Sequence, residues 1–222
     1  MSAPVRIGPV AVPRRTARLA GGLLAVELAL LGAYLALTDW SVLAPRYLLY
    51  PIVWVTVGVL AVARTAPVDA AVRSRLAAGT LAVGYLLALL WVDGSVSLHG
   101  TGTGFRLAWL PPGWGPAVLY GGASLSLALF PYRLVGYAAL AYLLYATAAT
   151  ASRVALGGLV GLVGGVAGTL PVVAALLSSA VGGSAAVAAA ATAWSYDLST
   201  VVFLLAVALL YWRPLSGGRL SA

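Results

Sequence analysis

A single carboxylate, Glu27, stands near the middle of an apolar run that extends from residue 18 to residue 38. A charge at the centre of a bilayer costs roughly 2.5 kcal/mol or more, so an acid there faces protein or water, is neutral, or carries function. No Arg is expected at the same depth, which leaves two roles open for Glu27. It is either a structural hydrogen-bonding partner of a neighbouring helix or a candidate proton or ion site. The neutral candidate partners in other apolar runs are Thr56, Thr80, Tyr85, Ser124 and Ser126.

The other residue types that often carry chemistry are few. Tyr196 and Asp197 match half of the pattern of intramembrane aspartyl proteases, but the G-x-G-D half is missing, and Asp93 lies at the end of a different apolar run. Two carboxylates that act as a dyad must share a proton, so we expect Asp197 to flank the start of the last helix instead. The one His, His99, lies in a Gly-rich stretch, where we expect a solvated loop residue.

Two absences narrow the chemistry further. The chain has no Cys and no Lys, so it forms no disulfide, no thiolate metal site and no lysine Schiff base of its own. The sequence predicts no catalytic set, no metal site and no cofactor.

The composition indicates a polytopic membrane protein. Hydrophobic residues make up 62% and charged residues 8% of the 222 residues, a balance that a soluble globule does not have. The net charge of +8 comes from Arg residues at the ends of apolar runs, which is typical of topology signals rather than of a nucleic-acid surface. The predicted partners are the lipid bilayer and other membrane subunits, and no nucleic acid is expected.

Seven apolar runs predict an all-α, polytopic transmembrane helical bundle of about seven spans. The runs cover residues 18–38, 46–63, 76–92, 114–131, 134–151, 154–181 and 194–212. The first run is about as long as the ~20 residues that cross a bilayer, so we expect an uncleaved span. The predicted domains are a basic cytoplasmic tail (residues 1–17), a single transmembrane helical domain (residues 18–212) and a short C-terminal tail (residues 213–222).

The distribution of Arg residues sets the predicted orientation in the cell membrane. With the N-terminus in the cytoplasm, eight Arg residues lie inside and five lie outside, which favours this orientation. The inside set is Arg6, Arg14, Arg15, Arg18, Arg64, Arg73, Arg75 and Arg133, and the outside set is Arg46, Arg106, Arg153, Arg213 and Arg219.

The sixth run, residues 154–181, is too long for a straight span and contains a predicted helix break at Gly168, Thr169 and Pro171. Pro171 removes the hydrogen bond that its N–H would donate to the carbonyl of Ala167. The run is either a kinked packing helix or a discontinuous helix that lines a site or turns back. Glycines at four-residue spacing predict close helix packing in the same run: Gly157, Gly161 and Gly165.

Three stretches carry a resemblance to a known group of proteins: P-R-Y-L-L-Y-P, W-L-P-P-G-W-G-P and Y-D-L-S-T-V-V-F. Their order is similar to that in uncharacterised multi-pass membrane proteins of halophilic archaea, and the likeness covers most of the chain. It implies no activity and assigns no functional residue.

Two functions therefore stay open on the sequence. The first is a non-enzymatic accessory or scaffold subunit of a membrane complex, which the small loops and the Gly-xxx-Gly pattern favour. The second is a small proton- or cation-coupled transporter that uses Glu27 and the predicted break. We favour the first.

Overall fold

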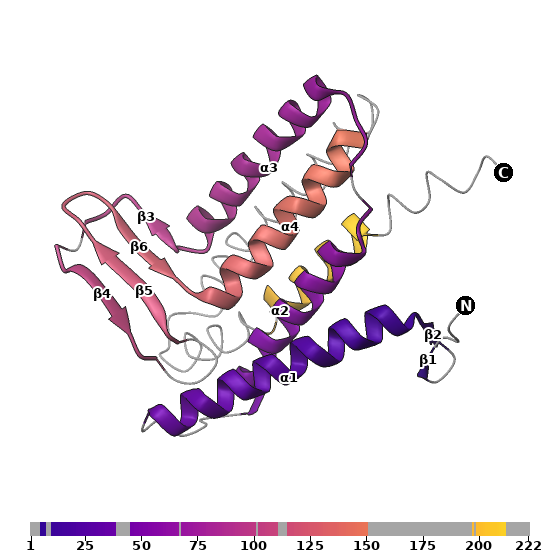
Figure 1. Ribbon diagram of the computed structural model, residues 1–222. Coiled ribbons are helices and arrows are strands. Elements are labelled where there is room, and N and C mark those ends of the chain that lie inside the picture. The colour runs from indigo at the N-terminus through magenta and orange to yellow at the C-terminus, as the bar shows by residue number, and fades with distance from the viewer. Residues whose placement is uncertain are drawn as a thin grey trace, which may run out of the picture.

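The computed structural model describes residues 5–7, 10–38, 45–66, 68–100, 102–110, 115–150, 197 and 199–211. These residues form five helices and two antiparallel sheets (Figure 1). The helices are α1 (Arg14–Leu37), α2 (Pro45–Arg64), α3 (Val72–Val92), α4 (Pro131–Thr150) and a last helix, Ser199–Tyr211. The strands are β1 (Val5–Ile7), β2 (Val10–Val12), β3 (Val96–Ser97), β4 (Gly104–Ala108), β5 (Ala117–Gly121) and β6 (Ser126–Leu129).

The prediction of an all-α bundle with seven spans is wrong. The fourth predicted span, residues 114–131, contains strands β5 and β6 of a four-stranded sheet. The stretch is apolar enough for a helix, but Gly121, Gly122 and the residues up to Leu125 make a turn, in which the Gly122 N–H donates to the Leu125 carbonyl at 2.8 Å. A strand, a turn and a second strand therefore occupy the residues predicted as one membrane span. Within the described part of the chain, two helices are long and apolar enough to cross a membrane, α1 and α3.

The sheet is an insertion between α3 and α4. Its strands follow the order β3-β6-β5-β4, all neighbours are antiparallel, and β4 forms one edge. Figure 1 shows the strands running across the direction of α3 and α4 rather than continuing along their axes. We call the end of the helices where this sheet lies the sheet end, and the opposite end the far end.

Helix α4 lies at the centre of the helices and packs against both α2 and α3. Most of its side chains are buried, and Leu143 and Leu144 are fully enclosed. Trp54 of α2 reaches this core, where its ring stacks on Phe203 at 4.3 Å between centroids and meets Tyr137 edge-on at 5.5 Å. The aromatic side chains therefore bind α2, α4 and the last helix into one unit.

The contacts at both ends of the helices give their directions. Ser74 of α3 donates to the Ala149 carbonyl of α4 at the far end, and Asp93 meets Arg133 at the sheet end, so α3 and α4 are antiparallel. Helix α2 is parallel to the last helix, because Trp54 contacts Phe203 and the Arg64 guanidinium lies 6.0 Å from the Tyr211 ring centre. Helix α2 is also parallel to α4, because Trp54 lies close to Gly136 and Gly58 lies close to Ala139. Both α2 and the last helix therefore run from the sheet end to the far end.

Candidate functional site

Glu27 of α1 lies against α2 and accepts a hydrogen bond from Thr56. The distance from Thr56 Oγ1 to Glu27 Oε2 is 3.0 Å. Thr56 is one of the five neutral partners that the sequence offered, and the structure brings this one to the carboxylate. The pair joins α1 to α2 in the middle of both helices, where little else on α1 is polar.

The second carboxylate oxygen of Glu27, Oε1, is buried and has no hydrogen-bond partner among the described residues. A buried acceptor without a partner carries a desolvation penalty, which a proton on the carboxyl group or a bound cation would reduce. One carboxylate oxygen of Glu27 thus accepts a hydrogen bond from Thr56, and the other can accept a proton or bind a cation.

The half-buried face of α1 that carries Glu27 is narrow. Leu23, Leu31 and Tyr34 are half-buried together with Glu27, whereas Leu24 and Leu30, three residues to either side of it, are exposed. Spacings of three and four residues place the half-buried side chains in one stripe. The remainder of α1 is exposed except for four further half-buried residues: Thr16, Ala17, Ala20 and Leu35. None of the residues of α1 is buried.

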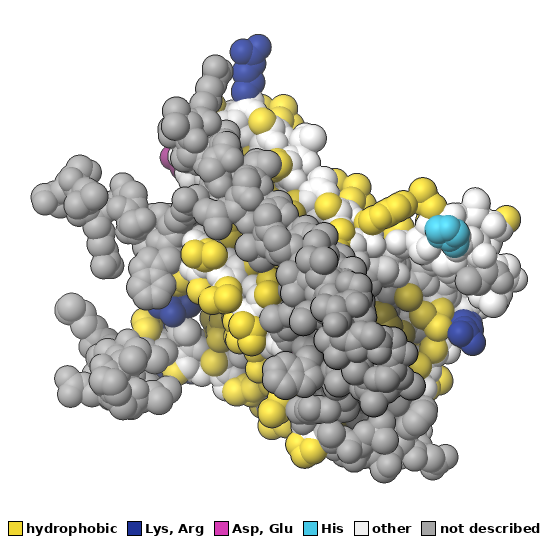
Figure 2. Space-filling view, turned by 180° about the vertical axis from the view of Figure 1, so that it is seen from behind, with side chains coloured by type: hydrophobic (Ala, Val, Ile, Leu, Met, Phe, Trp, Pro, Cys, Tyr) yellow, Lys and Arg dark blue, Asp and Glu magenta, His cyan; other side chains and the backbone are white. Residues whose placement is uncertain are grey.

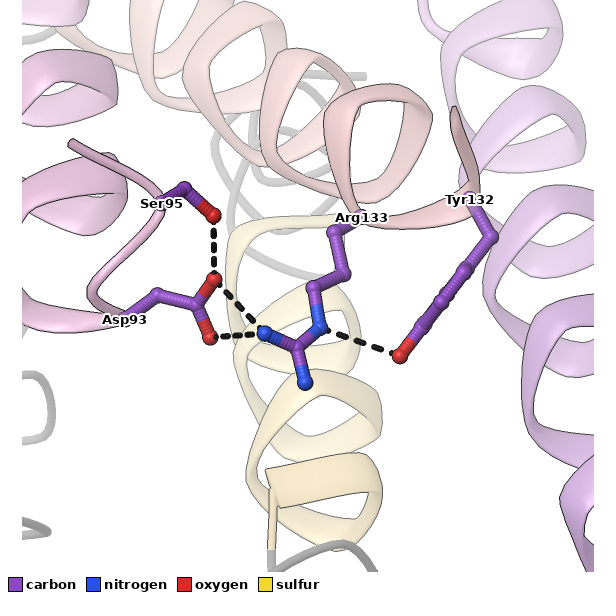
Figure 3. A network of polar contacts seen from close by, with 4 residues as sticks. All are labelled: Asp93, Ser95, Tyr132 and Arg133. Carbon is purple, nitrogen blue, oxygen red and sulfur yellow. Dashed lines mark hydrogen bonds and ion pairs between the residues drawn. The ribbon is translucent and has the colours of Figure 1, made fainter. Parts of the chain in front are cut away.

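A second polar cluster closes the sheet end of α3 and α4 (Figure 3). Arg133 Nη1 donates to both carboxylate oxygens of Asp93 at 2.8 Å, and Ser95 Oγ donates to Asp93 Oδ2 at 2.6 Å. Arg133 Nε also donates to the Tyr132 hydroxyl at 3.0 Å, and the guanidinium lies 5.0 Å from the centre of the Phe130 ring. Each charge in this cluster meets an opposite charge or a hydrogen-bonding partner, so the arrangement is suited to holding elements together.

Sequence reasoning missed this cluster. A fourth span between Asp93 and Arg133 would have put the two residues on opposite sides of the membrane, whereas the sheet returns the chain to the place where it left α3. The signal that could have found the pair is the alternation Ser-Leu-Ser-Leu at residues 124–127, which is typical of a strand and not of a span.

Asp197 also binds across helices. The Tyr50 hydroxyl of α2 donates to Asp197 Oδ1, just before the last helix begins. A few residues further along, Trp54 Nε1 donates to Thr200 Oγ1 at 3.1 Å. Asp197 therefore flanks the start of the last helix, as expected.

The remaining predicted residues are separate from these clusters or lie outside the described residues. His99 is exposed after β3, and Thr80 is exposed on α3, where it donates only to the Leu76 carbonyl of its own helix. The predicted packing and break residues all lie outside the described part of the chain: Gly157, Gly161, Gly165, Gly168, Thr169 and Pro171. Within that part, no three His, Asp or Glu side chains are grouped to hold a metal ion.

Comparison with known protein families assigns the chain to one family. A model described as a family of unknown function, DUF7546, matches residues 1–217. The chain belongs to this family. No curated protein and no solved structure matches the chain. The DUF7546 match covers nearly the whole chain, while a source in halophilic archaea and a place in the membrane stay predictions.

Proposed function

We propose that the protein is a multi-pass membrane protein that serves as a non-enzymatic accessory or scaffold subunit of a membrane complex. The observation that carries this proposal is the exposure of α1 and α3. Each has at least the ~20 residues that cross a bilayer, yet no residue of α1 is buried, and only Ala78 and Ala82 of α3 are. Exposure on this scale supports membrane-spanning helices over the core helices of a soluble protein.

The exposed surface of these helices is formed by large apolar side chains. On α1 and α3 they include Leu24, Val26, Leu28, Leu30, Leu37, Leu76, Val83, Leu87 and Trp91. In Figure 2 the apolar side chains (yellow) lie over the middle of the molecule, and the visible Arg side chains (dark blue) lie near its edges. Contact with lipid or with the helices of a partner would remove this apolar surface from water. Removal of apolar surface from water is the main favourable contribution to the free energy of association. A signal sequence would also explain α1, which lies near the N-terminus, but it would not explain α3.

The distribution of Arg residues supports an orientation with the sheet outside the cytoplasm. The far end carries six Arg residues of helices α1, α2 and α3: Arg14, Arg15, Arg18, Arg64, Arg73 and Arg75. The sheet end has three Arg residues among the described elements, namely Arg46 of α2, Arg106 of β4 and Arg133 of α4, and Arg133 is paired with Asp93. Because cytoplasmic loops are enriched in Arg, we infer that the far end is cytoplasmic. In this orientation Arg133 lies outside, whereas the sequence count placed it inside.

A reporter fused after Ala222 tests this orientation. Tyr34, near the end of α1, contacts Leu110 and Trp109 next to the sheet, so the start of α1 lies at the far end. The end of the helix Ser199–Tyr211 lies there too, so reporters at the N-terminus and at the C-terminus are both expected in the cytoplasm. A third reporter, inserted at the exposed Gly102, is expected on the other side. If Gly102 and Ala222 report the same side, the proposed orientation is wrong.

The polar side chains of the helices support a structural role. Thr56 binds Glu27, Trp54 binds Thr200, and Tyr50 binds Asp197, so each bond ties α2 to another element. Hydrogen bonds between helices in a membrane contribute about 0.6 kcal/mol on average. Several of them, together with the ring stacking around Trp54, suit a rigid body that presents surfaces to partners.

Two measurements test the scaffold role. Membranes washed with alkaline carbonate should retain the protein, and its release into the wash would contradict the membrane assignment. Purified in a mild detergent from its native membrane, the intact chain should migrate with a second membrane protein in fixed stoichiometry. A particle that contains this chain alone would contradict the accessory role.

One observation favours a second candidate function, a small proton- or cation-coupled transporter. The buried Oε1 of Glu27 has no hydrogen-bond partner within the part of the chain that the structure describes. Purified protein in liposomes should then move solute in response to a pH or cation gradient, and Glu27→Gln should abolish this flux while the protein stays folded, because the amide keeps the size and hydrogen-bonding capacity of the side chain. Under the scaffold proposal Glu27→Gln keeps folding and assembly, and no gradient-driven flux is expected from either protein.

A further inference from the structure

One face of the sheet exposes large apolar side chains to the surroundings. In the register of β4 and β5, Phe105 pairs with Tyr120 and Leu107 pairs with Val118. Directly opposed residues in a sheet share a face, and Tyr120 and Val118 in turn oppose residues of β6. The apolar sheet face therefore consists of Phe105, Leu107, Val118, Tyr120, Leu127 and Leu129. Phe105 is 71% exposed, Leu107 48% and Tyr120 40%.

The opposite face of the sheet differs in character. Arg106 of β4 lies there, opposite Leu119, and the neighbouring pair of Ala108 and Ala117 is small. Ala117 is fully buried, so this face is partly covered by other parts of the chain. Strand β4 is therefore amphipathic, with a cation on one side and an aromatic and an aliphatic side chain on the other.

The sheet is held close to the helix ends. The salt bridge between Asp93 and Arg133 closes its base, and three residues separate α3 from β3. Directly after β4, the Trp109 ring lies 5.9 Å from the Tyr34 ring of α1, and the Tyr34 hydroxyl donates to the Leu110 carbonyl at 2.5 Å. The sheet is thus fixed to two of the exposed apolar helices, α1 and α3, and lies across their direction (Figure 1).

We propose that the apolar sheet face rests in the boundary layer of the bilayer, where lipid headgroups meet acyl chains, and anchors the sheet end of the molecule at that depth. The inference rests on the proposed function, since it needs α1 and α3 in the membrane. Aromatic side chains are enriched in this layer, and a short sheet fixed to helix ends, with apolar residues on one face, is placed to lie on it as an amphipathic helix does. Trp91 at the sheet end of α3 is also exposed and adds a further aromatic side chain at the same end of the molecule as Phe105 and Tyr120.

Site-directed labels test the proposal, because the chain has no Cys and each introduced Cys is the only thiol. Phe105→Cys and Arg106→Cys are matched neighbours on opposite faces of β4, and Val26→Cys on the exposed side of α1 reports insertion of the helices. Each variant is labelled with an environment-sensitive fluorophore and reconstituted in phosphatidylcholine vesicles, with or without lipids that carry bromine near the top of the acyl chains. Iodide in the buffer is the aqueous quencher.

We expect brominated lipid to quench the label at Phe105 several-fold more strongly than the label at Arg106, and iodide to give the reverse order. Leu107→Cys should repeat the result for Phe105, which guards against a local effect of one substitution. Equal access of iodide to Phe105 and Arg106 would overturn the inference, because the sheet would then stand in water. Protection of Phe105 from both quenchers would also overturn it, because a protein would then cover the face.

The label at Val26 separates this inference from the proposed function. If brominated lipid quenches the label at Val26 but not the label at Phe105, the helices are in the membrane and only the anchoring of the sheet is wrong. If the label at Val26 is open to iodide and is not quenched by brominated lipid, both the membrane assignment and the anchoring are wrong.

Discussion

Helices α2 and α4 pack closely at Gly136, and replacing this glycine by alanine is expected to destabilise the protein. A Cβ atom at position 136 would lie 2.4 Å from Cε3 and 3.1 Å from Cζ3 of Trp54. The Trp54 ring has little room to yield, because it stacks on Phe203 with an interplanar angle of 7° and binds Thr200 through Nε1.

The size of the effect follows from two opposing terms. Overpacking a well-filled core costs about 1–3 kcal/mol, and a contact this short with a fixed ring belongs at the upper end of that range. Alanine stabilises a helix relative to glycine by about 1 kcal/mol. The free energy of unfolding should therefore fall by about 2 kcal/mol in Gly136→Ala. In Gly84→Ala on α3, where nothing lies within 4 Å of the added Cβ, it should rise by up to about 1 kcal/mol.

The assay is equilibrium unfolding of the purified variants in one detergent, followed by circular dichroism and by Trp fluorescence. Gly58→Ala, whose Cβ would lie 3.1 Å from the Ala139 Cβ, should fall between the other two variants. If Gly136→Ala unfolds at the same denaturant concentration as Gly84→Ala, the close packing of α2 on α4 around Trp54 is wrong.

Two further predictions concern the polar pairs. Thr56→Val should lower the free energy of unfolding by about 1 kcal/mol, because it removes an interhelical bond of about 0.6 kcal/mol and leaves the Glu27 carboxyl without a partner. Thr80→Val, at an exposed threonine that bonds only within its own helix, should change it by less than about 0.5 kcal/mol in the same assay. Asp93→Asn should lower the free energy of unfolding by about 2 kcal/mol. This value lies between the energies of a surface ion pair and of a fully buried one, because the side chains of Arg133 and Asp93 are 18% and 17% exposed. Adding Arg133→Met to Asp93→Asn should recover part of the loss, and strictly additive losses would show that the two side chains do not interact.

Hydropathy predicted the helices within a few residues, but it could not predict the sheet. The run at residues 18–38 corresponds to α1 (Arg14–Leu37), and the run at residues 134–151 corresponds to α4 (Pro131–Thr150). Both runs are uninterrupted, so the mean hydropathy of each run describes a single helix. The run at residues 114–131 is also largely apolar, but a Gly-Gly turn divides it, and two half-buried strands bury apolar residues as a helix does.

The candidate site was predictable only as a set of alternatives. The depth of Glu27 along its helix limited the partners to polar residues within other apolar runs, and Thr56 was among them because it lies within the run at residues 46–63. Which of five partners binds depends on helix rotation and crossing, which side-chain packing decides and a single sequence does not show. The pair of Asp93 and Arg133 depended on the sheet, so the error in one element carried over into the site.

The salt bridge at the base of the sheet has a consequence for how such a chain can change over time. Because Asp93 and Arg133 meet, the chain leaves the helices and re-enters them at one point, and α3 and α4 would be joined as an ordinary antiparallel helical hairpin if a short turn replaced everything in between. An insertion whose two ends coincide places no distance constraint on its host. The sheet can therefore be lengthened, exchanged or lost among related chains while the aromatic packing of the helices stays as it is.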